Sequence, residues 1–529
     1  MQCDMAHGPP GFRTSPPGLQ SLLRCWEPKL RVLAHRLSIK GAPDELPTMK
    51  FLLIVLALLG AVLCAPDTPD ADAFYSPPPG WEQKAPGAIL KTRTIEPGIV
   101  QYLKWNLTGY QLLYRTTAMD DAPSHTVTTV LVPSKAQKDK LLLIAPYIDA
   151  DGPQCAPSYT VQYGAHLDTN LLVTIQDFVW TAMANQGWIL TVPDQLGPMN
   201  AFGAGRLEGR MLLDGVRATL QFQELGLQKN TSVVGYGYSG GGLSGGWAAS
   251  LHAKYAPELN VAGWVLGGMP ANMSALMHHL DGGIWSGFVI GGLAGLMNGY
   301  AALRRALTPR LTKEGRSAIH FANTHCSLAI SARYPLQKVQ SDKYARNGTH
   351  LLSFSPLDAV VVSLTMGMQP DETPRAPVFY FHARHDDIIP YSAAAQAAKR
   401  WSSHGAHVKM LTFSGLFLSH TGMGALHVPY VLREIRDRFR RVPVPPGLTT
   451  ETLVNPLLDP HVPLEGIKEI WGALTSLFAS QIGARDKLVS DEWLAANSTR
   501  RALLAPHLKL SRNGRTGKAH GGVDAARQA

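Results

Sequence analysis

A glycine-flanked serine is the residue in this 529-residue sequence whose setting best suits nucleophilic chemistry. Ser239 lies in the pattern Gly-Tyr-Ser-Gly-Gly at 237–241, directly after the apolar run 232–236. In a tight turn from strand to helix, flanking glycines avoid side-chain collisions and leave the serine hydroxyl exposed. The same pattern recurs around Ser244, but that serine would lie one turn into the following helix. The context therefore predicts Ser239, rather than Ser244, as a nucleophile.

A serine hydroxyl needs a base to take its proton and a carboxylate to orient that base. Where the serine sits on such a turn, the acid follows a later strand and the histidine follows the next one. Asp386 and Asp387 both follow one late apolar run, and His420 follows the next, at 408–413. Its competitor His427 begins an amphipathic helical pattern that would hold it on a helix. The order along the chain predicts His420 as the base and leaves two neighbouring aspartates as the acid.

The elements that would position these residues alternate between helical patterns and continuous apolar runs. Uninterrupted apolar strands separated by helices are typical of a parallel sheet that is covered on both faces. The sequence therefore predicts an α/β fold with a mostly parallel sheet, and the proline-rich residues 66–98 suit an extended surface arm. The predicted buried strands are 141–146, 187–192, 232–236, 261–266, 377–381 and 408–413.

An interruption of this alternation predicts an inserted subdomain at 267–357, between the core parts 66–266 and 358–441. Two strand–helix units need only about 60 residues, and the gap is much longer. Within it, residues 282–303 contain no charged side chain and seven glycines. We interpret this segment as a mobile apolar cap; ordinary buried core and a membrane span are the alternatives.

The segment 49–64 has the layout of a secretory signal peptide: one lysine, about 14 apolar residues and small residues at the end. The run is short for a membrane span, which needs roughly 20 residues. We therefore expect secretion, a mature chain that begins near Ala65, and a gene-model extension or disordered leader at 1–48. The alternative is a signal anchor with a cytoplasmic tail.

Two cysteines, Cys155 and Cys326, stay in the sequence once residues 1–64 are removed. In an oxidising compartment they most simply form one disulfide, although two buried free thiols are the alternative. Secretion also makes Asn-x-Ser/Thr sequons candidates for glycosylation. These sequons are Asn106, Asn230, Asn272, Asn347 and Asn497.

The formal charge of +10 does not indicate a nucleic-acid partner. Residues 500–529 carry seven Lys/Arg and one acid, which is typical of a disordered basic tail at 501–529. Before it, residues 442–500 contain a proline-rich linker and apolar residues at helical spacing. We expect a C-terminal helical segment there that docks on the core; an interfacial anchor is the alternative.

Several motifs resemble those of the fungal secretory lipases, the group typified by Candida antarctica lipase A. The resemblance covers about residues 70–440 and implies an α/β-hydrolase fold with an inserted helical cap. It further implies hydrolysis of acylglycerols without a metal or an organic cofactor. The motifs are Asp-Ala-Phe-Tyr-Ser-Pro-Pro-Pro at 72–79, Cys-Ala-Pro-Ser-Tyr at 155–159, Val-Pro-Asp at 192–194, Leu-Asp-Gly-Val-Arg-Ala at 213–218 and the serine motif at 237–241.

The resemblance also implies roles for single residues. The nucleophile of the family falls on Ser239. Its acid falls on Asp386, because the pattern Asp-x-x-[Ile/Val]-Pro reads here as Asp-Asp-Ile-Ile-Pro at 386–390. Its histidine falls on His420, nine residues before Pro429.

The two oxyanion donors of the family would be the amide of Gly240 and one from the loop 147–151. In that loop we favour Asp149 over Asp151. The family's disulfide fits Cys155 with Cys326. The leader and the basic tail have no counterpart in the family pattern.

The resemblance thus implies a secreted triacylglycerol lipase that meets its lipid ester at an oil–water or membrane interface, without a stable protein partner. A carboxylesterase, or an acyltransferase in which another alcohol replaces water, would use the same residues. A hydrolase fold that has lost catalysis and serves in binding is a third alternative. The presence of all three triad candidates counts against it.

Overall fold

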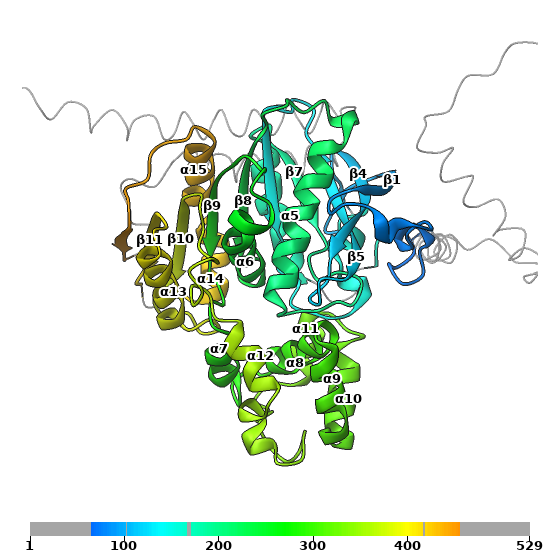
Figure 1. Ribbon diagram of the computed structural model, residues 1–529, viewed down its shortest axis with the longest axis vertical. Helices are drawn as coiled ribbons and strands as arrows, with labels where there is room; N and C mark the ends of the chain where they lie inside the picture. Colours follow the sequence, from blue (N-terminus) through cyan, green and yellow to red (C-terminus); the bar gives the residue numbers. More distant parts are fainter. Residues whose placement is uncertain (1–64, 102, 167–170, 416–417, 455–529) are drawn as a thin grey trace, which may run out of the picture. The chain divides into compact units, whose positions relative to one another are not determined.

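A ten-stranded sheet forms the centre of the computed structural model, which describes residues 65–454 apart from 102, 167–170 and 416–417 (Figure 1). The strands follow the order β1-β4-β5-β7-β6-β8-β9-β10-β11-β12, and β2 and β3 form a separate pair. Their bounds are β1 Ile89–Ile95, β2 Gly98–Ile99, β3 Leu103–Lys104, β4 Thr108–Thr117, β5 Pro123–Val132, β6 Lys140–Ala145, β7 Ile189–Pro193, β8 Ser232–Tyr238, β9 Val261–Gly267, β10 Val378–Ala383, β11 Val408–Phe413 and β12 Leu448–Leu453.

The sheet is parallel from β7 to β12 and antiparallel from β1 to β7. This confirms the mostly parallel sheet of the prediction. The surface arm expected at 66–98 is shorter, because β1 joins the sheet edge by pairing with β4. The run of three prolines ends at residue 79, and β1 itself contains no proline, so all its residues can donate and accept along a ladder.

Helices cover both faces of the parallel part. On β9, Gly263 faces Arg438 of α15, whereas Leu266 lies on the opposite face against Gly245 of α6. Residues three apart on a strand point to opposite faces, so α6 and α15 lie on different sides. Figure 1 shows α5 beside α6 across one face. The helices outside the insertion are α3 Pro157–Thr160, α4 Leu171–Ala184, α5 Gly205–Gln221, α6 Gly240–Tyr255, α13 Tyr391–Ser403, α14 His420–Leu426 and α15 Val428–Phe439.

The inserted residues form a helical cap at one end of the sheet, beyond the carboxyl ends of its parallel strands (Figure 1). A bridge between Asn272 and Thr365 closes its base, so the cap extends past the predicted boundary at 357. None of the described helices is long and apolar enough to cross a membrane. The cap helices are α7 Met273–Leu280, α8 Gly287–Gly299, α9 Ala301–Leu307, α10 Lys313–Ala322, α11 Ser327–Arg333 and α12 Leu357–Ser363.

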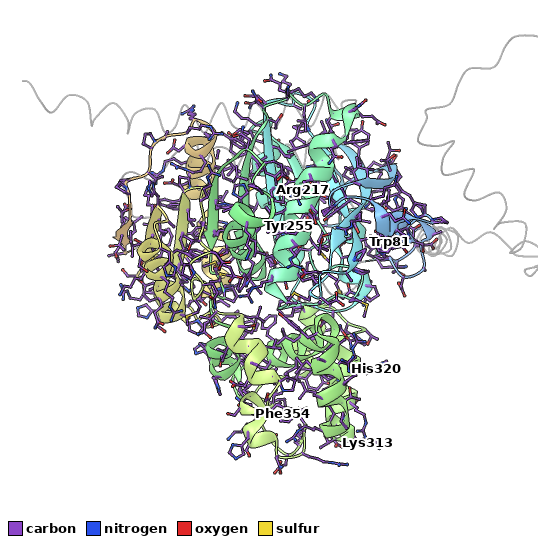
Figure 2. All side chains as sticks on the ribbon, viewed as in Figure 1. Trp81, Arg217, Tyr255, Lys313, His320 and Phe354 are labelled. Atoms are coloured by element: carbon purple, nitrogen blue, oxygen red, sulfur yellow. A yellow bond between two sulfur atoms is a disulfide. The ribbon has the colours of Figure 1, made fainter. Side chains whose placement is uncertain are left out.

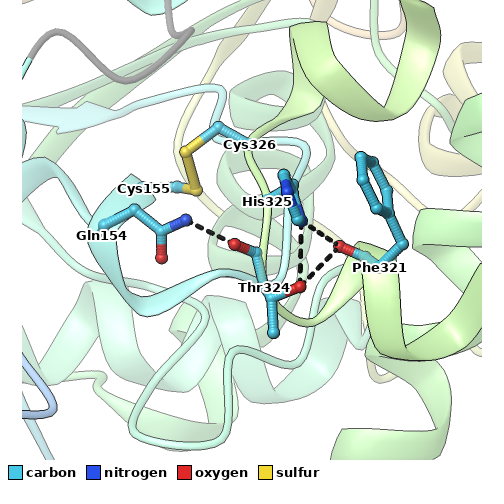
Figure 3. The surroundings of a disulfide bond; sticks show 6 residues. All are labelled: Gln154, Cys155, Phe321, Thr324, His325 and Cys326. Atoms are coloured by element: carbon cyan, nitrogen blue, oxygen red, sulfur yellow. Dashed lines mark hydrogen bonds between the residues drawn. A yellow bond between two sulfur atoms is a disulfide. The ribbon is translucent and has the colours of Figure 1, made fainter. Parts of the chain in front are cut away.

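A disulfide joins the cap to the core. Cys155 ends a short 3-10 helix in the core, and Cys326 caps the N-terminus of α11. Figure 3 shows a hydrogen bond beside it, from the Gln154 side-chain amide to the Thr324 carbonyl at 2.7 Å. The bridge closes a loop with a sequence separation of 171 residues, so it strongly restricts the unfolded chain.

The chain after α15 differs from the helical segment expected at 442–500. Residues Leu448–Leu453 form β12, which pairs in parallel with β11 at the sheet edge. Its sequence, Leu-Thr-Thr-Glu-Thr-Leu, is rich in β-branched residues, which favour strands. The rest of that segment, the leader, the signal peptide and the basic tail lie outside the described residues.

Three of the sequence motifs meet beside the loop that follows β6. The Asp194 carboxylate accepts hydrogen bonds from the amide and the hydroxyl of Ser158, and the Tyr75 hydroxyl bonds to the same serine at 2.7 Å. Burial raises the pKa of Asp194 to about 7. These motifs therefore have a structural role, because their hydrogen bonds connect the N-terminal arm and the loop after β6 to the sheet.

Candidate active site

Ser239 occupies a strained turn between β8 and α6. Its backbone has φ 57° and ψ −126°, a conformation that costs about 1–3 kcal/mol for a residue with a side chain. A Cβ at Gly237 would approach the Gly241 carbonyl oxygen to 2.2 Å, and a Cβ at Gly241 would approach the Ala145 carbonyl oxygen to 2.0 Å. The flanking glycines are therefore required by close packing, as the sequence predicted.

Hydrogen bonds connect Ser239, His420 and Asp386 in one line. The Ser239 Oγ lies 2.8 Å from His420 Nε2, and His420 Nδ1 lies 2.7 Å from Asp386 Oδ2. These lengths are within the reach needed for proton transfer and for orienting the imidazole. The structure thus brings the three predicted triad residues together. His420 is the first residue of α14.

The surroundings of Asp386 favour its ionised form. Burial by itself would raise the pKa of this carboxyl. The charge and hydrogen bond of His420, the nearby His382 and the amide of Ile389 outweigh burial, so the pKa lies below its usual value. A carboxylate that stays ionised can accept the His420 Nδ1–H and stabilise the imidazolium that forms during catalysis.

Asp387 contacts the same histidine in another way. Its Oδ1 accepts the backbone N–H of His420 at 3.0 Å, and its Oδ2 accepts the indole N–H of Trp285 at 3.1 Å. Trp285 belongs to the cap. Asp387 therefore lies outside the hydrogen-bonded line of Ser239, His420 and Asp386 but connects the histidine backbone to the cap, a role that no sequence motif indicated.

The competitors Ser244 and His427 lie apart from the triad. The Ser244 hydroxyl is buried in α6 and donates to Glu208 Oε2 at 2.6 Å. His427 is held between the Tyr236 hydroxyl and the Met423 carbonyl, and burial lowers its pKa to about 4. Both side chains are engaged in the core, so neither is available to a substrate.

The N-terminus of α6 and the loop after β6 meet beside Ser239. A Cβ at Gly240 would come within 1.9 Å of Asp149 Oδ1, so the two residues are in direct contact. Burial, opposed by the charge of His420, raises the pKa of Asp149 to about 6. Asp151 instead lies against the cap, 2.6 Å from the position of a Gly295 Cβ. A helix N-terminus stabilises negative charge, which suits an oxyanion at this place.

An apolar cavity lies over the serine, between the core and the cap. The volume of this cavity that the centre of a water molecule can occupy is about 50 Å³. A Cβ added at Gly292 of α8 would meet nothing within 4 Å, so the cavity extends toward that position. Its lining includes Ser239, Asp149 and Gly240 from the core, and Met273, Leu276, Met277, Leu280, Phe288, Val289 and Gly292 from the cap.

Two further residues support the site without having been predicted. The Tyr238 ring stacks on His420, with centroids 5.0 Å apart, and its hydroxyl donates to the His420 carbonyl at 2.7 Å. Glu208 accepts the amide of Gly203 and the hydroxyl of Ser244, and burial raises its pKa to about 8. Tyr238 is the variable residue of the serine motif, so only its position beside Ser239 could have drawn attention to it.

The sequons lie in different settings. Asn106, Asn230 and Asn347 are exposed, as glycosylation would require. Asn272 is half-buried, and its side chain caps α7 by accepting the Ala275 amide at 2.9 Å. Asn497 lies outside the described residues.

Within residues 65–454 as described, no group of three His, Cys, Asp or Glu side chains could hold a metal ion.

The sheet, the strained serine turn and the hydrogen-bonded Ser–His–Asp line define an α/β-hydrolase with the constellation of a serine hydrolase. The pattern of the secretory lipase family matches residues 161–446, and the chain belongs to that family. A secreted triacylglycerol lipase of Malassezia restricta is 42% identical over 447 residues, covering 83% of this chain and 95% of the relative. One from Malassezia globosa is 38% identical, covering 82% and 92%.

Solved structures agree with this assignment. Candida antarctica lipase A is 27% identical, with a TM-score of 0.69, and the match covers 77% of this chain and 95% of that one. A rice cell wall degrading esterase from Xanthomonas oryzae is 15% identical with a TM-score of 0.53, and it shows the fold alone.

Proposed function

We propose that this protein is a secreted serine lipase that hydrolyses acylglycerol ester bonds through an acyl-enzyme on Ser239. The observation that carries the proposal is the Ser239–His420–Asp386 line, which opens into an apolar cavity roofed by the cap. Membership of the secretory lipase family and the names of the Malassezia relatives support the substrate class.

The first half of the reaction forms the acyl-enzyme. His420 Nε2 takes the proton of the Ser239 hydroxyl while Oγ attacks the ester carbonyl carbon. Asp386 accepts the Nδ1–H and stabilises the imidazolium. The amides of Gly240 and Asp149 bind the oxyanion, and losing one such donor typically costs about 3 kcal/mol of barrier. His420 then protonates the leaving alcohol oxygen as the carbon–oxygen bond breaks.

The second half releases the fatty acid. Water replaces the alcohol, and His420 takes one of its protons as the water oxygen attacks the acyl carbon. The oxyanion collapses, the bond to Ser239 Oγ breaks, and His420 returns the proton to the serine. The low pKa of Asp386 keeps it ionised throughout, so the imidazole stays in the required tautomer.

The lining of the cavity favours fatty acyl groups. Its cap side consists of Met, Leu, Phe and Val side chains and of Gly292, which offer an acyl chain no hydrogen-bonding partner. Transfer of about 10 methylenes from water to such surroundings is worth roughly 8 kcal/mol before the costs of binding. A hydrolase for short, soluble esters has no use for this surface.

Hydrolysis of emulsions tests the proposal. The purified protein should release fatty acids from emulsified medium- and long-chain triacylglycerols, and Ser239→Ala should reduce kcat at least about 10³-fold. Ser244→Ala serves as the matched control and should keep most of the activity. Cleavage of soluble esters without any attack on emulsions would replace the lipase with a carboxylesterase. Acyl transfer to added alcohol in preference to water would indicate an acyltransferase.

A further inference from the structure

The cap differs from the rest of the protein in its charge. The cap, taken from Asn272 to Thr365, contains nine Lys/Arg and four Asp/Glu, a formal charge of +5. Residues 65–271 and 366–454 together contain 23 Lys/Arg and 24 Asp/Glu, so the core is almost neutral. Eight of the nine basic side chains of the cap are exposed, and Arg310 is half-buried. The cap is therefore a positively charged surface attached to a neutral domain.

These charges are not compensated within the described part of the chain. None of the nine lies within ion-pair distance of a described carboxylate, whereas Arg206, Arg210 and Arg217 in the core all form ion pairs. Two of the four acids of the cap are occupied otherwise: Asp281 accepts the amide of Val339, and Asp342 accepts that of Gly348. Uncompensated charge of one sign attracts a partner of the opposite sign.

Five of the basic residues surround one short bridge between Leu311 and Ala345, and we term them the basic cluster. Arg310 and Arg346 are joined there by a hydrogen bond from the Arg346 amide to the Arg310 carbonyl at 2.9 Å. Figure 2 shows Lys313 at the end of the cap that lies away from the sheet. The basic cluster consists of Arg310, Lys313, Arg316, Lys343 and Arg346.

Next to the basic cluster lies an apolar tip made of Ile284 and Leu336. They are 62% and 69% exposed, and the Leu336 amide donates to the Gly283 carbonyl at 2.9 Å, which brings the two loops together. Lys343 Nζ donates to the side chain of Gln337, the neighbour of Leu336, at 2.6 Å. The tip and the basic cluster therefore meet at the contact between Gln337 and Lys343.

Leu336 carries two costs in water. Its side chain is mostly exposed, and its φ of 57° is a left-handed conformation that disfavours a leucine by about 1–2 kcal/mol. Asparagine would accept this φ far more readily and would be soluble. A leucine that is both strained and exposed indicates that its side chain contacts a binding partner.

The tip also borders the active site. Ile284 is followed by Trp285, whose indole N–H binds Asp387, and Asp387 accepts the backbone amide of His420. The Trp285 ring stacks on Phe288, which lines the cavity over Ser239. A surface that binds the tip therefore lies close to the cavity over Ser239.

We propose that the basic cluster and the apolar tip form a docking face that seats the protein on an anionic lipid surface. The proposal rests on the lipase function above and specifies the surface on which it works. Lipolysis releases fatty acid carboxylates, so an oil surface under attack becomes anionic and would retain the protein more strongly as the reaction proceeds. Ile284 and Leu336 would enter the apolar layer while the arginines and lysines contact the carboxylates.

Sedimentation with vesicles tests the docking face in the Ser239→Ala background, which prevents hydrolysis. The protein should bind vesicles of phosphatidylcholine mixed with phosphatidylglycerol at least about tenfold more strongly than vesicles of phosphatidylcholine alone. Each Lys or Arg near an anionic leaflet contributes about fivefold, so the triple variant should lose most of this preference. That variant is Lys313→Gln/Lys343→Gln/Arg346→Gln.

A matched control removes three exposed lysines from the core and should keep the preference. It is Lys84→Gln/Lys135→Gln/Lys229→Gln. Leu336→Asn should weaken binding to both kinds of vesicle at least about threefold without lowering Tm, because asparagine relieves the backbone strain. A purely structural role for Leu336 would lower Tm instead.

Equal loss of binding in the two triple variants, or equal binding to the two kinds of vesicle, would overturn the docking face. So would loss of heparin binding in the cap variant with vesicle binding unchanged, since the face would then serve a polyanion. Hydrolysis of a soluble short-chain ester by the same variants with Ser239 restored separates the two proposals. If that activity is absent from the unmodified protein, the lipase function fails, whatever the vesicles show.

Discussion

Replacing Gly292 with leucine should shorten the acyl chains that the protein accepts. Gly292 lies on α8 and lines the cavity over Ser239, and a Cβ there would meet nothing within 4 Å. A side chain at this position therefore begins in open space, and we expect a leucine to enter the cavity and occupy space otherwise open to the substrate. Short acyl groups that end before this point would not meet it.

The size of the effect follows from the methylenes that are displaced. A leucine side chain has four carbons, so it would exclude about four methylenes of a long acyl chain. At about 0.8 kcal/mol each, the loss is about 3 kcal/mol, which corresponds to a decrease of about 100-fold in kcat/KM. Gly292→Ala should have a smaller effect of about one methylene, roughly fourfold.

The assay is a chain-length profile of p-nitrophenyl esters from butyrate to palmitate, measured with the unmodified protein and both variants. The kcat/KM for palmitate should fall with the size of the side chain, and that for butyrate should stay within about twofold. Replacement of a helical glycine by alanine removes backbone entropy from the unfolded state, so Gly292→Ala should not lower Tm.

Gly291 provides the control on the same helix. Its Cβ would meet Phe202 at 3.8 Å, an ordinary contact, and it does not line the cavity. Gly291→Ala should therefore leave the chain-length profile unchanged. A uniform loss across all chain lengths in Gly292→Leu, with Tm unchanged, would refute the placement of the acyl chain along α8.

Three further results are expected. Asp387→Asn should reduce kcat about 10-fold, less than loss of the triad acid, because an amide still accepts the His420 N–H but bonds the cap more weakly; a drop above about 10³ would make Asp387 the acid. Burial raises the pKa of Glu208 from 4.5 to about 8, so its stabilising contribution is complete below pH 4.5 and is lost as the pH rises toward 8. Glu208→Gln should therefore reduce the fall in unfolding free energy between pH 5 and 8 by at least about 1 kcal/mol, as measured by urea titrations at each pH. An unchanged pH dependence of the unfolding free energy would contradict the raised pKa of Glu208. Cys155→Ser/Cys326→Ser should lower the unfolding free energy by about 2–5 kcal/mol, read as a fall in Tm, and an unchanged Tm would show that the bridge is dispensable.

Local sequence patterns were sufficient to predict Ser239 and His420 as members of the candidate site. A strand before Ser239 and glycines around it encode the turn directly, because close packing at those positions excludes any side chain. His420 could be identified by its order after two late strands. The choice of Asp386 over Asp387 needed the resemblance to a family, because both carboxylates contact His420. Asp386 contacts the ring nitrogen Nδ1, whereas Asp387 contacts the backbone amide.

Other features depend on contacts between distant segments and left no local signal. The hydrogen bond from Trp285 to Asp387 spans 102 residues, and that from Ser244 to Glu208 spans 36. The end of the cap is set by the pairing of Asn272 with Thr365, not by composition. The strand β12 was missed because its polar, edge-strand sequence follows a proline-rich linker and precedes a strong helical pattern.

We expect Ser239 to react as the nucleophile of a serine hydrolase. Labelling of the folded protein with a fluorophosphonate, followed by digestion and mass spectrometry, tests it most directly. One phosphonate should be found on Ser239, and both His420→Ala and prior denaturation should abolish the labelling. A label on Ser244, or no label in a protein that hydrolyses esters, would rule out Ser239 as the nucleophile.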